Sequence, residues 1–354
     1  MSSAVAERSA IELDLAEIRS VVAANASAVD RAELPASWLL PELAQRGLLD
    51  SGAEDVANLA HLIDTIAQED LATAFSVWAH RMVLEYLTRA ERSPFIDEEL
   101  AELRTGARVG STAMASGVKA LAGIEALPVT ATRDGDGLRL DGVIPWASNL
   151  TANGTVVLPA GQVGAPPIAV ALRLDTPGIT RRDVRGLLAL EATASGSLQL
   201  SGVRVDPAAV LSRDLGTLVR GFRPAFLILQ SSFALGLARR AVAEAQTLDH
   251  RPDQLALRPQ VQAIAAALAR HTATRDRLAA APGQASDREL LTLRLDVVEL
   301  AVAATRLEST LTGGRGYLAA SPTARRLREA AFLPIQSPSE GHLRWELSSL
   351  ASTA

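Results

Sequence analysis

The sequence predicts an α+β fold in which a central β domain lies between two helical regions. Apolar residues recur at helical spacing from about residue 11 to 104 and again after residue 212. Between these regions, short runs that alternate apolar with polar residues are interrupted by Gly and Pro, as is typical of strands. Hydrophobic residues make up 48% of the chain but aromatic residues only 3%, so the core must consist of Ala, Leu and Val, which favours closely packed helices.

The first helical region is predicted over residues 1–107. Trp38, Leu43 and Leu48 fall on one stripe, and residues 56–90 contain neither Pro nor Gly. Both features are typical of helices that bury one face.

The β domain is predicted over residues 108–212 and contains the turn sequence Asp134-Gly135-Asp136-Gly137. Because this sequence separates two short runs, it predicts a β-hairpin. Further strands are expected near residues 154–158, 168–172 and 197–205. The last region, residues 213–354, has helical segments near 215–249, 255–281 and 286–312, with a break at Pro282-Gly283.

Composition excludes several classes of function. The formal net charge is -5, so no basic surface for nucleic acid is expected. The chain has no cysteine, which excludes disulfides and thiolate metal sites, and no His cluster has metal-ligand spacing. Residues 1–8 lack the design of a signal peptide, and no uncharged apolar run reaches the roughly 18 residues of a membrane span. We therefore expect a cytoplasmic protein that binds a small molecule, with no membrane or nucleic-acid partner.

The most informative motifs lie near the C-terminus, in residues 311–347. They are Thr312-Gly313-Gly314-Arg315-Gly316-Tyr317, Ser321-Pro322, Arg328-Glu329 and Pro334-Ile335-Gln336-Ser337-Pro338-Ser339-Glu340. This order resembles the end of acyl-CoA dehydrogenases, where a GGxGY-type loop precedes a proline, an Arg-Asp pair and a P-I-Y-E-G-T-S-E segment. The resemblance implies an N-terminal helical domain, a central β-barrel or sandwich domain, a C-terminal four-helix bundle, and FAD as cofactor.

A second motif lies in the β domain. Residues 140–149, L-D-G-V-I-P-W-A-S-N, resemble the family segment L-x-G-x-K-x-W-I-(S/T)-N. In the family the Trp stands beside the flavin ring, and the Ser or Thr forms a hydrogen bond near the reactive flavin N5. A planar ring needs a flat apolar wall and a hydroxyl that fixes its orientation. The resemblance therefore assigns these roles to Trp146 and Ser148.

The partner loop of that motif matches the family only in part. In residues 111–118, Met114 fits the family's A-M-T-E-P pattern, but Ala115 replaces the hydroxyl that would face the flavin, and the Glu-Pro pair is missing. Ser116, one residue later, is the candidate substitute. The resemblance places Ser339 at the cofactor as well.

The family holds the diphosphate and adenine of FAD with an Arg-x-x-Phe-Gly stretch and a following Gln, answered by Gln-x-x-Gly-Gly of a second subunit. Here Arg251 lacks the Phe-Gly, Gln260 follows at a shortened distance, and Gly313 and Gly314 lack the leading Gln. The two glycines fit a helix C-cap equally well. The shared site implies a homodimer or homotetramer, and the choice between FAD and FMN stays open.

The proton-abstracting glutamate of the family is missing. Setting Pro334-Ile335 on the family's Pro-Ile puts Ser337 at its position, and a hydroxyl without activation is too weak a base. The alternative family position lies within residues 223–236, which contain no Asp or Glu. Glu340, about one helical turn later, and His342 are the candidates for a relocated catalytic group.

The substrate contacts are changed as well. The family arginine that fixes the nucleotide part of an acyl thioester falls at Leu227, and Arg223, one turn earlier, is the candidate replacement. Phe226 and Phe233 are predicted to line the substrate pocket. Together these changes argue against an ordinary acyl-CoA substrate.

Three hypotheses follow. The first is a flavin-dependent oxidoreductase with an altered active site, either a non-standard dehydrogenase or oxidase, or a monooxygenase, because oxygen activation at the flavin needs no glutamate. The second is an acyl-CoA dehydrogenase with a relocated base, or the non-catalytic subunit of a mixed assembly. The third is a scaffold or binding protein that holds no flavin.

Overall fold

The computed structural model describes residues 2–49, 55–248 and 250–352. The N-terminal part is helical, and Asp55, Asp70 and Ser93 each cap a helix by accepting a hydrogen bond from the backbone N–H three residues on. Its elements are α1 (Ser2–Asp30), η1 (Ala36–Leu39), α2 (Leu40–Gln45), α3 (Val56–Ala67), α4 (Leu71–Thr88) and α5 (Pro94–Arg104).

The β domain is one mixed sheet with the strand order β6-β7-β3-β2-β4-β5-β8, and β1 pairs with β4. Its strands are β1 (Gly110–Thr112), β2 (Val129–Asp134), β3 (Gly137–Ala147), β4 (Thr155–Gln162), β5 (Ala165–Arg173), β6 (Ile179–Asp183), β7 (Gly196–Val205) and β8 (Val210–Ser212). The short helices α6 (Ala115–Leu121), η2 (Glu191–Thr193) and η3 (Pro207–Ala209) connect them.

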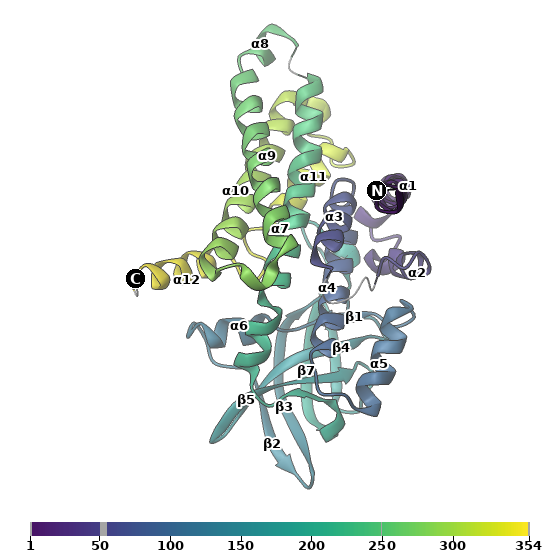
Figure 1. The fold of residues 1–354 in the computed structure, drawn as a ribbon, viewed down its shortest axis with the longest axis vertical. Helices are drawn as coiled ribbons and strands as arrows, with labels where there is room; N and C mark the ends of the chain where they lie inside the picture. Colours follow the sequence, from purple (N-terminus) through teal and green to yellow (C-terminus); the bar gives the residue numbers. More distant parts are fainter. Residues whose placement is uncertain (1, 50–54, 249, 353–354) are drawn as a thin grey trace.

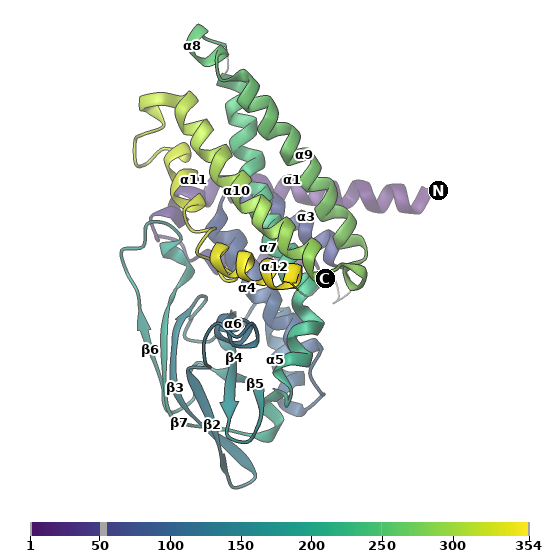
Figure 2. The ribbon, with the colours of Figure 1, turned by 90° about the vertical axis from the view of Figure 1, so that its left-hand side faces the viewer.

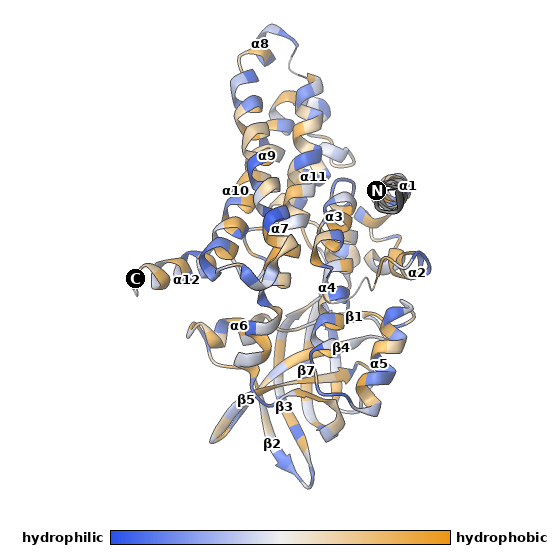
Figure 3. Ribbon diagram, in the orientation of Figure 1, coloured by the Kyte–Doolittle hydropathy of each residue, from blue (hydrophilic) through white to orange (hydrophobic). Residues whose placement is uncertain are grey.

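The predicted hairpin is confirmed. Asp134 pairs with Gly137 at the closing end of β2 and β3, and Gly135 takes the left-handed conformation, with φ +66°, that this turn requires. Figure 3 shows hydrophilic residues at this far end of the hairpin, where the strands extend beyond the rest of the domain.

The C-terminal part is helical again, and the predicted break at Pro282 is confirmed. Its elements are α7 (Leu215–Leu248), α8 (Pro252–Leu255), α9 (Arg258–Ala280), η4 (Pro282–Gln284), α10 (Asp287–Thr312), η5 (Gly313–Arg315), α11 (Pro322–Ala330) and α12 (Glu340–Ser352). By length and composition α7 alone among the described helices passes as a membrane span, but 89% of its apolar window is buried inside the protein. It is therefore a core helix.

Two packing regions hold these parts together. One core cluster joins the N-terminal helices to the C-terminal helices, with α4 buried along its whole length up to Leu87. A second cluster fills the interior of the sheet. Figures 1 and 2 show the sheet at one end of the molecule and α8 at the other, with α4 and α7 reaching down to the sheet. A cavity lies at the junction of sheet and helices.

Candidate functional site

A cavity of about 560 Å³ lies where the end of β3 and the segment before β7 meet α4, α7 and α11. That size is typical of a small-molecule or cofactor site. Of the residues predicted at the site, the cavity lining includes Ala115, Ser116, Trp146, Ser148, Phe226, Ser337 and Ser339. Sequence motifs more than two hundred residues apart therefore meet in one cavity.

The β side of the cavity presents the ring of Trp146. The β3–β7 ladder is irregular between Ile144 and Ala147, and such irregularities re-aim side chains. Trp146, inside this stretch, lines the cavity and remains 57% exposed. Its ring is therefore accessible to a ligand. We call this side the β wall, defined by residues 144–148 and 193–195.

Asn149 fixes the β wall to α4. It is buried and has the left-handed φ of +59° that non-glycine residues rarely adopt. Its side-chain Nδ2 donates to the carbonyls of Ser76 (2.9 Å) and Gly110 (3.1 Å), and its Oδ1 accepts from the Ser76 hydroxyl (2.7 Å). The asparagine of the sequence motif therefore has a structural role that the motif itself does not reveal.

His80 completes this anchor as a neutral side chain. Its Nδ1 accepts from the backbone N–H of Gly110 (2.9 Å), so its Nε2 carries the hydrogen that reaches the carbonyl of Leu103 (3.1 Å). Burial lowers the pKa of His80 to about 4. The imidazole therefore holds strand β1 against α4 in its uncharged form.

Three hydroxyl groups form a chain along the β wall. The Thr193 hydroxyl donates to the carbonyl of Leu190 (2.7 Å), Ser195 lies 2.7 Å from Thr193, and Ser148 lies 2.7 Å from Ser195, all measured between oxygen atoms. All three hydroxyl-bearing residues line the cavity. Leu190 and Ala194, which flank η2, have left-handed φ values of +62° and +47°. Such backbone strain is common at functional sites.

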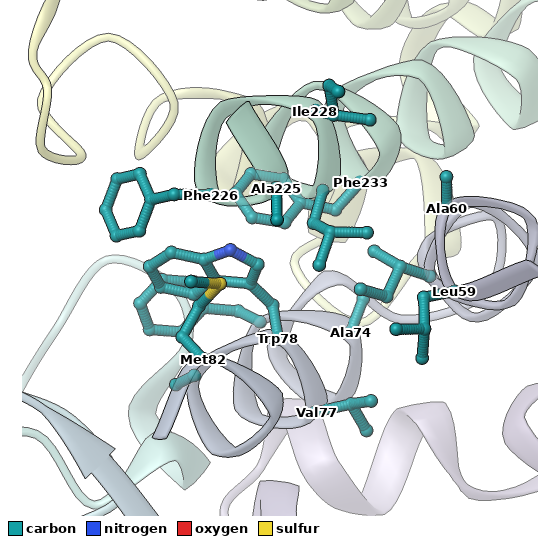
Figure 4. Close-up of a cluster of buried hydrophobic side chains, with 14 of the residues drawn as sticks. Leu59, Ala60, Ala74, Val77, Trp78, Met82, Ala225, Phe226, Ile228 and Phe233 are labelled. Carbon is teal, nitrogen blue, oxygen red and sulfur yellow. The ribbon is translucent and has the colours of Figure 1, made fainter. Parts of the chain in front are cut away.

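The opposite side of the cavity, formed by α4, α7 and α11, is aromatic. Of the chain's six Phe, four Trp and two Tyr, five residues line this single cavity, four of them on the helical side: Phe75, Trp78, Phe226 and Phe332. Figure 4 shows Phe226 and Trp78 facing each other between α7 and α4. The indole nitrogen of Trp78 points toward α7, and it has no hydrogen-bond partner among the described residues.

Ser337 is held on the helical side of the cavity by a buried polar cluster. The Arg294 guanidinium donates to Gln230 (3.2 Å) and Gln336 (2.5 Å), and Gln230 in turn donates to the carbonyl of Ser337 (2.9 Å). Burial lowers the pKa of Arg294 to about 9. The Ser337 hydroxyl itself is buried without a hydrogen-bond partner among the described residues. Ser337 lines the cavity, and no base among the described residues accepts a hydrogen bond from its hydroxyl.

The structure places Glu340, His342 and Arg223 outside the cavity lining. Glu340 begins α12 and pairs with Arg344 (2.9 Å). The Arg223 guanidinium donates to Glu346 (2.5 Å), and His342 Nε2 lies 2.8 Å from the other oxygen of the same carboxylate. Burial raises the pKa of Glu346, but these two neighbours outweigh burial and lower it. The three side chains of this cluster connect α12 to α7.

The other predicted contacts are divided between the core and the far end of the bundle. Phe233 is fully buried beneath Trp78, with ring centroids 6.0 Å apart, and Met114 is fully buried beside the cavity residue Ala115. The predicted dinucleotide residues Arg251, Gln260, Gly313 and Gly314 lie at the far end, where the Gln254 side chain donates to the carbonyl of Leu311 (2.9 Å).

At this far end the two glycines are exposed, and Gly313 caps α10 with φ +66°. Both of their sequence interpretations, a helix cap and a phosphate contact, are therefore compatible with their position. The role of the four dinucleotide residues in binding stays a prediction.

Sequence reasoning missed several lining residues. Phe75 and Trp78 lie three positions apart in α4, a spacing that predicts only a shared face. Thr193 and Ser195 lie at the start of a segment for which the sequence predicted a strand but no site residue. The charged lining residues are paired: Lys119 lies 3.4 Å from Glu125, and Arg328 donates to Asp30 (2.5 Å). No sequence pattern connects partners as distant as Arg328 and Asp30.

The order of domains and the cavity at their junction define an acyl-CoA dehydrogenase-like fold, and the predicted fold class is confirmed. The glutaryl-CoA dehydrogenase of Mycobacterium smegmatis in complex with FADH2 matches with a TM-score of 0.84 at 17% identity, covering 96% of this chain and 95% of that one.

Two further structures match over almost their whole length. The prolyl acyl carrier protein oxidase AnaB matches with a TM-score of 0.82 at 18% identity, over 96% of this chain and 98% of that one. KijD3 in complex with FMN and a dTDP-sugar matches with a TM-score of 0.78 at 20% identity, over 97% and 93%. No family model and no curated protein matches the sequence. At these identities the comparison establishes the fold.

Proposed function

We propose that this chain is a flavin-dependent oxidoreductase with an altered active site, which acts on a small, uncharged substrate and does not use the family's glutamate. The observation that carries the proposal is the composition of the cavity: an exposed Trp ring and a hydroxyl chain on one side face an aromatic wall on the other. An exposed flat ring beside polar groups suits a planar heterocycle, which needs both a wall and orienting hydrogen bonds.

The cavity residues fit a flavin by other criteria as well. Ser116 and Ser337 each have a buried hydroxyl without a hydrogen-bond partner among the described residues, and both line the cavity. Buried hydroxyls normally have partners, so these two are available to a ligand. Trp146 and Ser148 would hold the ring, with Ser116 and Ser339 beside it. Bound there, a flavin supplies hydride acceptance or oxygen activation.

The proposed substrate class follows from charge. Lys119 and Arg328, the cationic residues of the lining, are each paired with a carboxylate, and the remaining lining residues are mostly apolar. A charged substrate buried there would leave its charge uncompensated, which is costly. The aromatic residues Phe75, Trp78, Phe226 and Phe332 instead favour a flat or branched apolar group. The chain's part is to orient this group and to exclude water.

Spectroscopy and cofactor extraction test the proposal. The purified protein is expected to be yellow, with absorbance near 450 nm, or to become so after addition of FAD or FMN, and mass spectrometry of the extracted cofactor identifies which flavin is bound. A colourless protein that binds neither flavin would instead support a scaffold or binding protein. Oxygen consumption with NADH or a reductase partner would favour the monooxygenase form of the proposal.

One observation favours a second candidate, acyl-thioester dehydrogenation with a relocated base. Glu125 is the one carboxylate in the cavity lining formed by the described residues, and its side chain is 44% exposed. Anaerobic bleaching of the bound flavin by acyl-CoA thioesters, abolished in Glu125→Gln, would support this candidate. Absence of bleaching with the whole thioester series would exclude it.

A further inference from the structure

The hydroxyl chain on the β wall has a fixed direction. Each hydroxyl carries one hydrogen, and that of Thr193 is donated to the carbonyl of Leu190, which can only accept. In the Thr193–Ser195 contact Thr193 must therefore accept, so Ser195 donates. In the Ser195–Ser148 contact the hydrogen of Ser195 is already used, so Ser148 donates.

This direction determines what Ser148 offers to the cavity. Its single hydrogen points along the wall to Ser195, which leaves only oxygen lone pairs for a ligand. Ser148 can turn its hydrogen to a ligand only at the loss of one hydrogen bond of the chain: its own bond to Ser195 or, if Ser195 reverses to donate to Ser148, the bond from Ser195 to Thr193. One such bond is worth about fivefold to tenfold in an equilibrium constant. The β wall therefore prefers a ligand atom that carries a hydrogen.

We propose that the Thr193–Ser195–Ser148 chain tunes the redox state of the bound flavin by favouring its reduced form; this inference rests on the proposed function. Two ring nitrogens of a flavin have lone pairs in the oxidised form and hydrogens in the reduced form. A hydroxyl that can only accept a hydrogen bond repels the nitrogen lone pairs of the oxidised flavin and binds the N–H groups of the reduced flavin. Ser148 would touch the ring, whereas Thr193 and Ser195 act through it as positioning residues.

The backbone supports this assignment. The hydroxyl of Thr193 is fixed by the turn at η2, whose flanking residues Leu190 and Ala194 both have left-handed φ values. Thr193 is also buried, with 2% exposure. A rigid, buried origin keeps the chain from reversing freely. An exposed origin would exchange with water and lose its direction.

Thr193→Val is the decisive variant, because it keeps the volume of residue 193 and the hydroxyls of Ser195 and Ser148 but removes the acceptor that orients them. Ser195 is then free to donate to Ser148, and Ser148 to the oxidised ring. We expect the oxidised flavin to bind about fivefold to tenfold more tightly relative to the reduced flavin, which lowers the midpoint potential by about 20 to 30 mV.

Two further variants and a control complete the test. Ser195→Ala releases the hydrogen of Ser148 and Ser148→Ala removes the acceptor, so both are expected to lower the potential as well. Ser197→Ala, two residues after Ser195 at the start of β7 and outside the cavity lining, is expected to leave it unchanged. The midpoint potential is measured by equilibration with redox dyes, and the dissociation constants of oxidised and dithionite-reduced flavin are measured separately.

The outcomes are distinguishable from failure of the proposed function. A protein that binds neither FAD nor FMN contradicts the proposed function itself. If flavin binds but Thr193→Val and Ser195→Ala leave the potential unchanged or raise it, the redox-tuning proposal is overturned while the flavin site stands. Equal weakening of both oxidation states would assign the chain a purely structural role and also overturn the proposal.

Discussion

The two sides of the cavity differ in how their polar groups are used. On the β wall the hydroxyls of Thr193, Ser195 and Ser148 are partnered in sequence. On the helical side the Ser337 hydroxyl and the Trp78 indole nitrogen are buried without partners among the described residues. The polar groups of the β wall are therefore held by one another, whereas those of the helical side are available to a ligand.

The largest effect is expected where the β wall meets α4. Asn149→Ala removes hydrogen bonds to Ser76 and Gly110 and places an alanine at φ +59°. Because buried backbone carbonyls lose their donors and the backbone is strained, the free energy of unfolding is expected to fall by about 3 to 5 kcal/mol, measured by urea denaturation.

Asn149→Gly is the matched control for this prediction. Glycine adopts the left-handed conformation without strain, so it is expected to lose only the hydrogen-bond contribution and to be more stable than the alanine variant by about 1 kcal/mol. Equal stability of both variants with the wild type would show that the β wall is held by something other than Asn149.

The second largest effect is expected for the pH dependence of stability, through His80 at the junction of β1 and α4. His80 has a pKa of about 4 in the folded protein, below the ordinary 6.5, so the unfolded chain takes up the proton first. Stability from this group is complete above pH 6.5 and decreases as the pH falls toward 4, by about 3 kcal/mol in total. Unfolding free energies measured at pH 7 and pH 4.5 test this expectation.

A variant isolates the contribution of His80 from that of other groups. Burial raises the pKa of Glu329 to about 7, and its contribution has the opposite sign, because it is complete below pH 4.5 and decreases as the pH rises through 7. His80→Asn removes the first contribution and keeps the second. If wild type and variant lose the same stability between pH 7 and 4.5, His80 is not the neutral anchor of β1.

The ring of Trp146 is expected to contribute to flavin binding. Trp146→Ala removes the exposed ring of the β wall, and stacking of a heterocycle on an aromatic side chain is worth about 1 to 3 kcal/mol. We expect flavin affinity to fall by about 100-fold at the upper end of that range, with little loss of stability, as measured by fluorescence titration.

Trp345→Ala is the control for this variant, because Trp345 is similarly exposed, at 54%, but lies on α12 outside the cavity lining. Its flavin affinity is expected to equal that of the wild type. A comparable loss in both variants would mean that Trp146 does not form the flavin wall.

Sequence patterns predicted the frame of this protein better than its site. Periodicity and turn residues are local, so the order of helices and strands and the hairpin at Asp134 were predictable. Trp146, Ser148 and Ser337 could be proposed as site residues because each stands at a position of a recognised sequence motif. The hydroxyl partner Ser195 and the aromatic residue Phe332 could not be predicted, since tertiary contacts alone bring them to the cavity.

The smallest effects are expected for the two candidates for a relocated catalytic group, Glu340 and His342, since neither side chain lines the cavity. Glu340→Gln and His342→Gln are expected to leave the absorbance maximum of the bound flavin unchanged and its dissociation constant within about twofold, the usual range for changes outside a site. Ser337→Glu serves as the positive control, because it puts a carboxylate into the cavity lining, where charge acts on a bound ring with little screening. If Glu340→Gln or His342→Gln alters the flavin spectrum as strongly as Ser337→Glu does, α12 must move toward the cavity in the flavin-bound protein. The helical side of the cavity would then contain a catalytic base.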